Sequence, residues 1–206
     1  MDARQRALCL RQITRQRGVG RRLLDESQRL AIYADPTYGN DNPKGGLKGL
    51  ITARSIALLS YRSYSGYAAN QTESDNERTD DFLASSYQRY QGEKLAKRFN
   101  AYSYVLLSKA MDAHNVGRGR TSVEHALTQI RAKTLVIGIG SDVLFPVSEQ
   151  QFLAEHIQHA RYEQITSDFG HDGFLLEYEQ LTWCISAFYA NELPVNLPGL
   201  PTINYN

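Results

Sequence analysis

The sequence predicts an α/β fold in which a helical region precedes a short parallel sheet with flanking helices. Three observations lead to this prediction. Residues 23–120 carry apolar side chains near helical spacing and contain no strand-like run. "KTLVIGIG" (133–140) is a continuous apolar, β-branched run, typical of a strand buried on both faces of a parallel sheet. "RYEQITS" (161–167) follows a helix-like segment, so strand, helix and strand form a βαβ unit.

Composition limits the class of protein. The chain has 206 residues, of which 42% are hydrophobic, enough for one domain with a core. No run approaches the roughly 18 apolar residues of a membrane span, and the first residues lack the apolar core of a secretory signal. We therefore expect a cytoplasmic protein without membrane contact. Two cysteines, Cys9 and Cys184, are too few for a disulfide framework.

Charge is distributed unevenly along the chain. Residues 1–22 hold seven arginines and one acid, whereas the rest of the chain carries 16 basic and 21 acidic side chains. Such a segment suits a nucleic-acid arm or a targeting peptide. It lacks, however, the interleaved aromatic residues of the first and the serine enrichment of the second. We interpret residues 1–22 as a disordered leader and expect no nucleic-acid partner.

The elements follow from local patterns. In the helical region, 23–120, "LLDESQRLAIYAD" (23–35) stops before Pro36, as a helix should. The further helices expected there are 47–64, 81–98 and 101–113. The sheet region, 121–190, adds helices at 148–160 and 174–190, and a Pro-rich tail, 191–206, follows.

Two polar residues lie just past the ends of the two predicted strands. Asp142 follows the first strand in "GIGSDVLFP", and His171 follows the second in "DFGHDGF". Parallel strands present their carboxyl ends at one edge, so the two side chains can meet there as the acid and base of a catalytic triad. The order Asp then His is also that of the α/β-hydrolase fold. The alternative for Asp142 is a turn or helix cap. His156 and His159 lack a third ligand, so no metal site is expected.

Four segments carry a resemblance to a known family. They are "GLKGLITARSIALLSYRSY", "SSYQRYQGEKLAKRFNAYSYVLLSKAMD", "KTLVIGIGSDVLFPVSEQQFLAEHI" and "ARYEQITSDFGHDGFLLE". Together they resemble homoserine O-acetyltransferase, an α/β-hydrolase-fold acyltransferase of methionine biosynthesis, from about residue 23 to 189. The resemblance implies that 23–120 is a helical lid and 121–190 the C-terminal part of the hydrolase core. It also implies acetyl transfer from acetyl-CoA, as co-substrate, to L-homoserine through an acyl-serine, with no bound cofactor, and a homodimer formed through the lid helices.

The resemblance also assigns residues. Asp142 matches the triad acid and His171 the triad base. Arg54 matches the lid arginine that holds the substrate carboxylate, Tyr61 the active-site tyrosine after it, and Asp172 the residue that meets the substrate amino group. Arg54 and Tyr61 are two helical turns apart and would share a face. From the residues alone, the favoured interpretations are a salt bridge for Arg54 and a core position for Tyr61.

The sequence departs from the family at the nucleophile, because it contains no G-x-S-x-G motif. We therefore expect a C-terminal portion of such an enzyme that is inactive alone, since loss of the serine costs about 10⁶-fold in related serine enzymes. The alternatives are a non-catalytic interaction module that pairs with a separate N-terminal chain, and a small hydrolase that uses Ser141. The choice between acetyl and succinyl donors, and between homoserine and serine acceptors, stays open.

Overall fold

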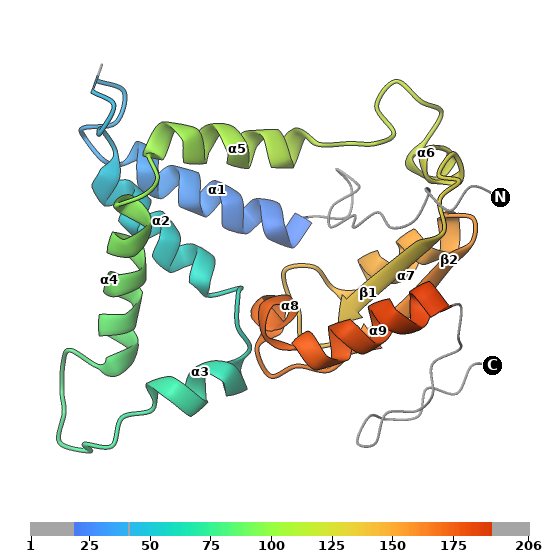
Figure 1. The fold of residues 1–206 in the computed structure, drawn as a ribbon. Coiled ribbons are helices and arrows are strands. Elements are labelled where there is room, and N and C mark those ends of the chain that lie inside the picture. The colour runs from blue at the N-terminus through green and yellow to red at the C-terminus, as the bar shows by residue number, and fades with distance from the viewer. Residues whose placement is uncertain (1–18, 41, 191–206) are drawn as a thin grey trace.

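The computed structural model describes residues 19–40 and 42–190, in which a group of helices lies beside a small sheet (Figure 1). One long connection, residues 114–122 between α5 and α6, links the helical group to the sheet region (Figure 1). The elements are α1 (Val19–Tyr33), α2 (Leu47–Leu58), α3 (Tyr64–Gln71), α4 (Leu83–Ala96), α5 (Ala101–Ala113), α6 (Val123–Thr128), β1 (Thr134–Ile139), α7 (Val147–His156), β2 (Ala160–Ile165), the 3₁₀ turn η1 (Gly170–Asp172), α8 (Gly173–Leu176) and α9 (Tyr178–Ala190).

The sheet consists of β1 and β2, which pair in parallel, as predicted. The register runs from Thr134 opposite Ala160 to Ile139 opposite Ile165. Successive strand residues point to opposite faces, and each face has its own helix. On one face Val136 packs with residues of α7, and on the other Ile139 and Ile165 pack with Cys184 of α9. The sheet is thus covered on both faces, as its apolar sequence predicts.

The helical group is built around α2. α1, α4 and α5 contact it through a core of Ile32, Leu50, Ala53, Leu95, Ala101 and Val105. Glycine allows α1 and α2 to approach closely. A Cβ atom at Gly49 would lie 2.5 Å from Cα of Ile32. A side chain at this position would force the two helices apart.

The face of α1 that packs on the protein is largely charged. Arg21, Asp25 and Arg29 are buried, whereas Leu23 and Leu30 are 68% and 56% exposed. Both arginines reach Asp112 of α5, at 3.2 Å from Arg21 and 2.8 Å from Arg29. The helix also begins at Val19, so residues 19–22, which we had assigned to a disordered leader, form its first turn.

Two predicted helices are interrupted. The helix expected over 47–64 ends at Leu58, and α3 begins after Ser63, whose hydroxyl accepts a hydrogen bond from the Gly66 amide. A serine in this position competes for helical backbone donors and starts a new helix. The helix expected over 174–190 divides at Glu177, and α6 is a short helix that no sequence pattern predicted.

Some predictions lie outside the described residues. These are the disordered state of residues 1–18 and the Pro-rich tail, 191–206. Among the residues that the structure describes, no helix is long and apolar enough to cross a membrane.

Candidate active site

The two parallel strands bring Asp142 and His171 together, although 29 residues separate them. Nδ1 of His171 lies 2.8 Å from Oδ2 of Asp142. The other carboxylate oxygen, Oδ1, accepts hydrogen bonds from the amides of Leu144 at 2.8 Å and Phe145 at 2.9 Å. Asp142 therefore serves both of the roles considered from the sequence, since it caps the turn after β1 and also holds the imidazole.

These contacts determine how the imidazole is oriented. An ionised carboxylate only accepts hydrogen bonds, so we assign the proton to Nδ1 of His171. Nε2 is then left with its lone pair, which is the arrangement a general base requires. The side chains of His171 and Asp142 are only 12% and 6% exposed, so little water competes for the bond between them.

Aromatic rings surround the imidazole. The ring centroids of Phe145, Phe174 and Tyr61 lie 5.2, 5.6 and 5.7 Å from that of His171. Tyr61 has a second neighbour, because the guanidinium of Arg54 lies 4.9 Å from its ring centroid. Arg54 and Tyr61 thus meet as predicted, although the helix that carries Arg54 ends before Tyr61. Tyr61 therefore contacts both the candidate base and the Arg54 guanidinium.

Asp172 is already paired with a cation. Nε of Arg62 lies 3.1 Å from Oδ2 of Asp172, and the two side chains are 25% and 21% exposed. The Asp172 amide also donates to the carbonyl of Tyr61 at 2.9 Å. Arg62 was not predictable from the sequence, because no local pattern indicates a contact between residues 110 positions apart.

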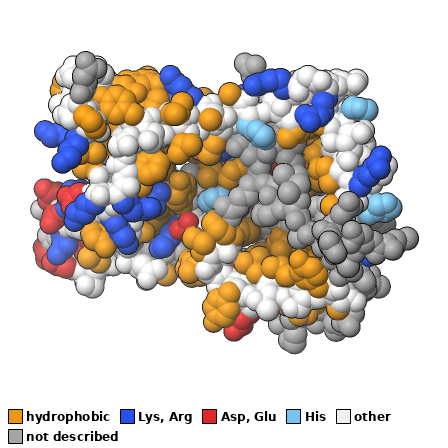
Figure 2. Space-filling view, turned by 45° about the horizontal axis from the view of Figure 1, so that its top comes forward, with side chains coloured by type: hydrophobic (Ala, Val, Ile, Leu, Met, Phe, Trp, Pro, Cys, Tyr) orange, Lys and Arg blue, Asp and Glu red, His pale blue; other side chains and the backbone are white. Residues whose placement is uncertain are grey.

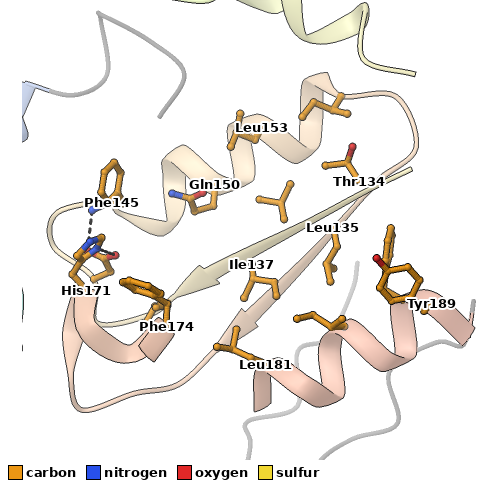
Figure 3. A pocket seen from close by; sticks show the side chains of 16 residues that line it. Thr134, Leu135, Ile137, Phe145, Gln150, Leu153, His171, Phe174, Leu181 and Tyr189 are labelled. Atoms are coloured by element: carbon orange, nitrogen blue, oxygen red, sulfur yellow. Dashed lines mark hydrogen bonds and ion pairs between the residues drawn. The ribbon is translucent and has the colours of Figure 1, made fainter. Parts of the chain in front are cut away.

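A cavity of about 410 Å³ extends from His171 along β1. His171 and Phe145 lie at one end and Tyr189 at the other, with α7 and α9 forming the walls (Figure 3). Residues from both faces of β1 line it, but none from β2 does. The cavity therefore lies at the edge of β1 that faces away from β2.

The described residues hold neither a metal cluster nor a serine bonded to the imidazole. No group of three or more His, Cys, Asp or Glu side chains converges in 19–40 or 42–190. The hydroxyl of Ser141, the nucleophile of the small-hydrolase alternative, donates instead to the carbonyl of Ser167 at 2.6 Å. This bond turns the hydroxyl toward the backbone, which argues against that alternative.

Solved structures define the class of this fold. The chain superposes on a homoserine O-acetyltransferase from Bacillus anthracis with a TM-score of 0.72 at 18% identity, covering 85% of this chain and 50% of that one. It superposes equally well, at 0.72, on the esterase E22, again at 18% identity, covering 85% and 52%. The described residues thus form part of an α/β-hydrolase fold.

Sequence relatives define the family more closely. A homoserine O-acetyltransferase from Cyclobacterium marinum is 50% identical over 165 residues, which cover 80% of this chain and 47% of that protein. The enzyme from Thermus thermophilus is 42% identical over 168 residues, covering 81% and 42%. The Staphylococcus aureus structure is 30% identical, with a TM-score of 0.64, covering 87% and 49%. The matched residues are homologous to homoserine O-acetyltransferase, and the chain spans about half the length of these curated relatives.

One family model gives a different match. A model described as "Acetyltransferase (GNAT) domain, PanZ" matches residues 1–41. This segment is 41 of the 206 residues and includes the Arg-rich segment, so it does not define the class of the chain.

Proposed function

We propose that this chain supplies the acid–base half of a homoserine O-acetyltransferase active site. The observation that carries the proposal is the 2.8 Å contact between His171 and Asp142. Identity of 50% to an enzyme of that name supports the reaction. His171 is then the general base and Asp142 the acid that orients it.

The substrate contacts follow from the charges around the base. L-homoserine carries a carboxylate and an ammonium group, so a site for it needs one cation and one anion. Arg54 suits the carboxylate, since guanidinium binds carboxylate through two parallel hydrogen bonds. Asp172 suits the ammonium, and Tyr61 lies between Arg54 and His171 and would cover the carbon chain.

The reaction runs in two proton-balanced steps. Nε2 of His171 takes the proton of a serine hydroxyl, the serine attacks the thioester of acetyl-CoA, and the thiolate of CoA leaves with that proton. The homoserine hydroxyl then attacks the acyl-serine. His171 takes the proton from this hydroxyl and returns it to the serine, which frees O-acetyl-L-homoserine. No step requires a metal ion.

The serine comes, in this proposal, from a β-strand that docks on the edge of β1 facing away from β2, with which no strand pairs among residues 19–40 and 42–190. The cavity along that edge has apolar walls on both sides, from α7 and α9, so it suits a strand that is apolar on both faces. A strand parallel to β1 would end at the same edge of the sheet as His171. This surface also supports the second candidate, a non-catalytic module that pairs with an N-terminal chain.

The homodimer is proposed on a separate surface. Hydrophobic side chains gather over the region of α1 and α5 (Figure 2). They include Leu23, Leu30, Leu106 and Leu107, which are between 52% and 69% exposed. An exposed apolar face of this kind favours association with a second copy.

The experiment supplies the proposed strand from a relative. The part of the Cyclobacterium marinum enzyme that this chain does not match is co-expressed with the 206-residue chain, and O-acetyl-L-homoserine is measured after addition of acetyl-CoA and L-homoserine. We expect product from the co-expressed pair and none from either part alone. Stable pairing without product would favour the non-catalytic module. Failure to pair would contradict the docking of a strand on β1.

A further inference from the structure

The chain between α2 and α3 lies directly against the loop that carries His171 (Figure 1). We call residues 61–66 the corner and residues 168–172 the base loop. Three polar contacts join them. The Asp172 amide donates to the Tyr61 carbonyl at 2.9 Å, Arg62 pairs with Asp172 at 3.1 Å, and the Ser63 hydroxyl donates to the Asp168 carbonyl.

Two glycines let the backbones of the corner and the base loop touch. Gly170 has φ +59°, and a Cβ atom there would lie 2.9 Å from the Ser63 nitrogen. A Cβ atom at Gly66 would lie 2.6 Å from the Asp168 carbonyl oxygen. Because no side chain separates the two segments, a shift of the corner moves the base loop with it.

Arg62 spans this contact from the helical side. Its guanidinium carbon lies 5.9 Å from the ring centroid of Tyr87 on α4, and its Nε reaches Asp172 on the base loop. A partly exposed ion pair of this kind contributes little stability, typically below about 1 kcal/mol. The ion pair acts on position rather than on stability. Asp172 follows His171 directly in the chain, and its amide donates a hydrogen bond to the Tyr61 carbonyl.

We propose that Arg62 is a positioning residue for the reaction. It holds Oδ2 of Asp172 and leaves Oδ1 for the substrate ammonium. Through Asp172 it fixes the base loop, so that Nδ1 of His171 stays on Asp142 and Nε2 stays directed to the reacting hydroxyl. This inference rests on the function proposed above and adds a residue to it.

The test follows the Nδ1 proton of His171 by ¹⁵N NMR of the whole chain. Its exchange with water reports how often the bond to Asp142 opens. We expect Arg62→Ala to speed exchange by up to about fivefold, in keeping with the loss of one partly buried ion pair, and Arg62→Lys to restore part of the protection. Arg89→Ala is the matched control, since it removes an exposed ion pair with Asp81 on the far helical side. Wild-type exchange in Arg62→Ala would overturn the proposal.

A pair of glycine substitutions tests the same contact without removing a charge. Gly170 and Gly119 both have positive φ, +59° and +73°, but nothing lies within 4 Å of a Cβ atom at Gly119. Gly170→Ala should therefore speed His171 exchange, and Gly119→Ala should not. Equal effects of the two would contradict positioning by the corner. The readout needs no acetyl transfer, so altered exchange in a pair that makes no product would leave this inference standing while the proposed function fails.

Discussion

At the scale of the residue, the environment of each carboxylate decides its role. Asp142 accepts two amide hydrogen bonds through Oδ1, which cap the turn, and holds the imidazole of His171 through Oδ2. Asp25 is also a buried carboxylate, but it pairs with Arg21 on the same helix and holds no imidazole. Burial, together with the nearby Asp112 carboxylate, raises the pKa of Asp25 to about 6, although Arg21 and Arg29 act to lower it. The two residues show that a buried acid need not be a catalytic one.

The raised pKa of Asp25 predicts a pH dependence of stability. The folded chain holds this proton more tightly than the unfolded chain, whose carboxyl has a pKa of 3.8. The stability it contributes is present below about pH 4 and is lost as the pH rises through about 6, by roughly 2–3 kcal/mol. Asp25→Asn should flatten this decline in urea-unfolding free energies between pH 4 and 7. Glu93→Gln, at an exposed carboxylate of α4, serves as control, and an unchanged decline in Asp25→Asn would contradict the assignment.

At the scale of the element, the sequence predicts the sheet better than the helices. The parallel pairing of β1 and β2 was predictable from the apolar run 133–140 and from the alternation of strand and helix. The contact between Asp142 and His171 was predictable because each residue follows the end of a strand. The interruption at Leu58–Ser63 was not predictable from periodicity, because it depends on contacts with the distant base loop. The charged packing face of α1 was missed for the same reason, since its partner Asp112 lies on α5.

Close packing of α1 on α2 gives a prediction for glycine. A methyl group at Gly49 would lie 2.5 Å from Cα of Ile32, so Gly49→Ala should destabilise the chain by about 1–3 kcal/mol. Gly20 is its control, because it lies in α1 with nothing within 4 Å of an added Cβ atom. Gly20→Ala should be neutral or slightly stabilising. Thermal unfolding of the two variants checks this, and equal melting temperatures would show that the helices are not in contact at Gly49.

At the scale of the whole molecule, two apolar surfaces serve different partners. The edge of β1 is enclosed by α7 and α9 and suits a strand, whereas the exposed leucines of α1 and α5 suit a second copy of the helical group. The surface for the strand ends at His171 and Asp142, which line the cavity along β1, whereas the exposed leucines lie on the helical group. A docked strand would therefore meet the candidate base directly, and a second copy would associate through the helical group.

The proposed homodimer predicts the effect of a charge on α1. Leu23→Glu should shift the chain from dimer to monomer in sedimentation equilibrium, because it places a carboxylate in the apolar contact. Tyr178→Glu, at the start of α9, introduces the same charge at a side chain that is 70% exposed and should leave the mass unchanged. A wild-type chain that is monomeric at high concentration would contradict the dimer.

The central claim is that His171 is the base of acetyl transfer, and its removal tests this most directly. In the co-expressed pair, the rate of O-acetyl-L-homoserine formation is compared between the wild type, His171→Ala and His125→Ala, the last replacing an exposed histidine of α6. We predict that His171→Ala lowers the turnover by about 10⁶-fold, as loss of the base does in related serine enzymes. His125→Ala should keep the wild-type rate. A His171→Ala pair that turns over within about tenfold of the wild type, far less than the loss a missing base causes, would contradict the claim.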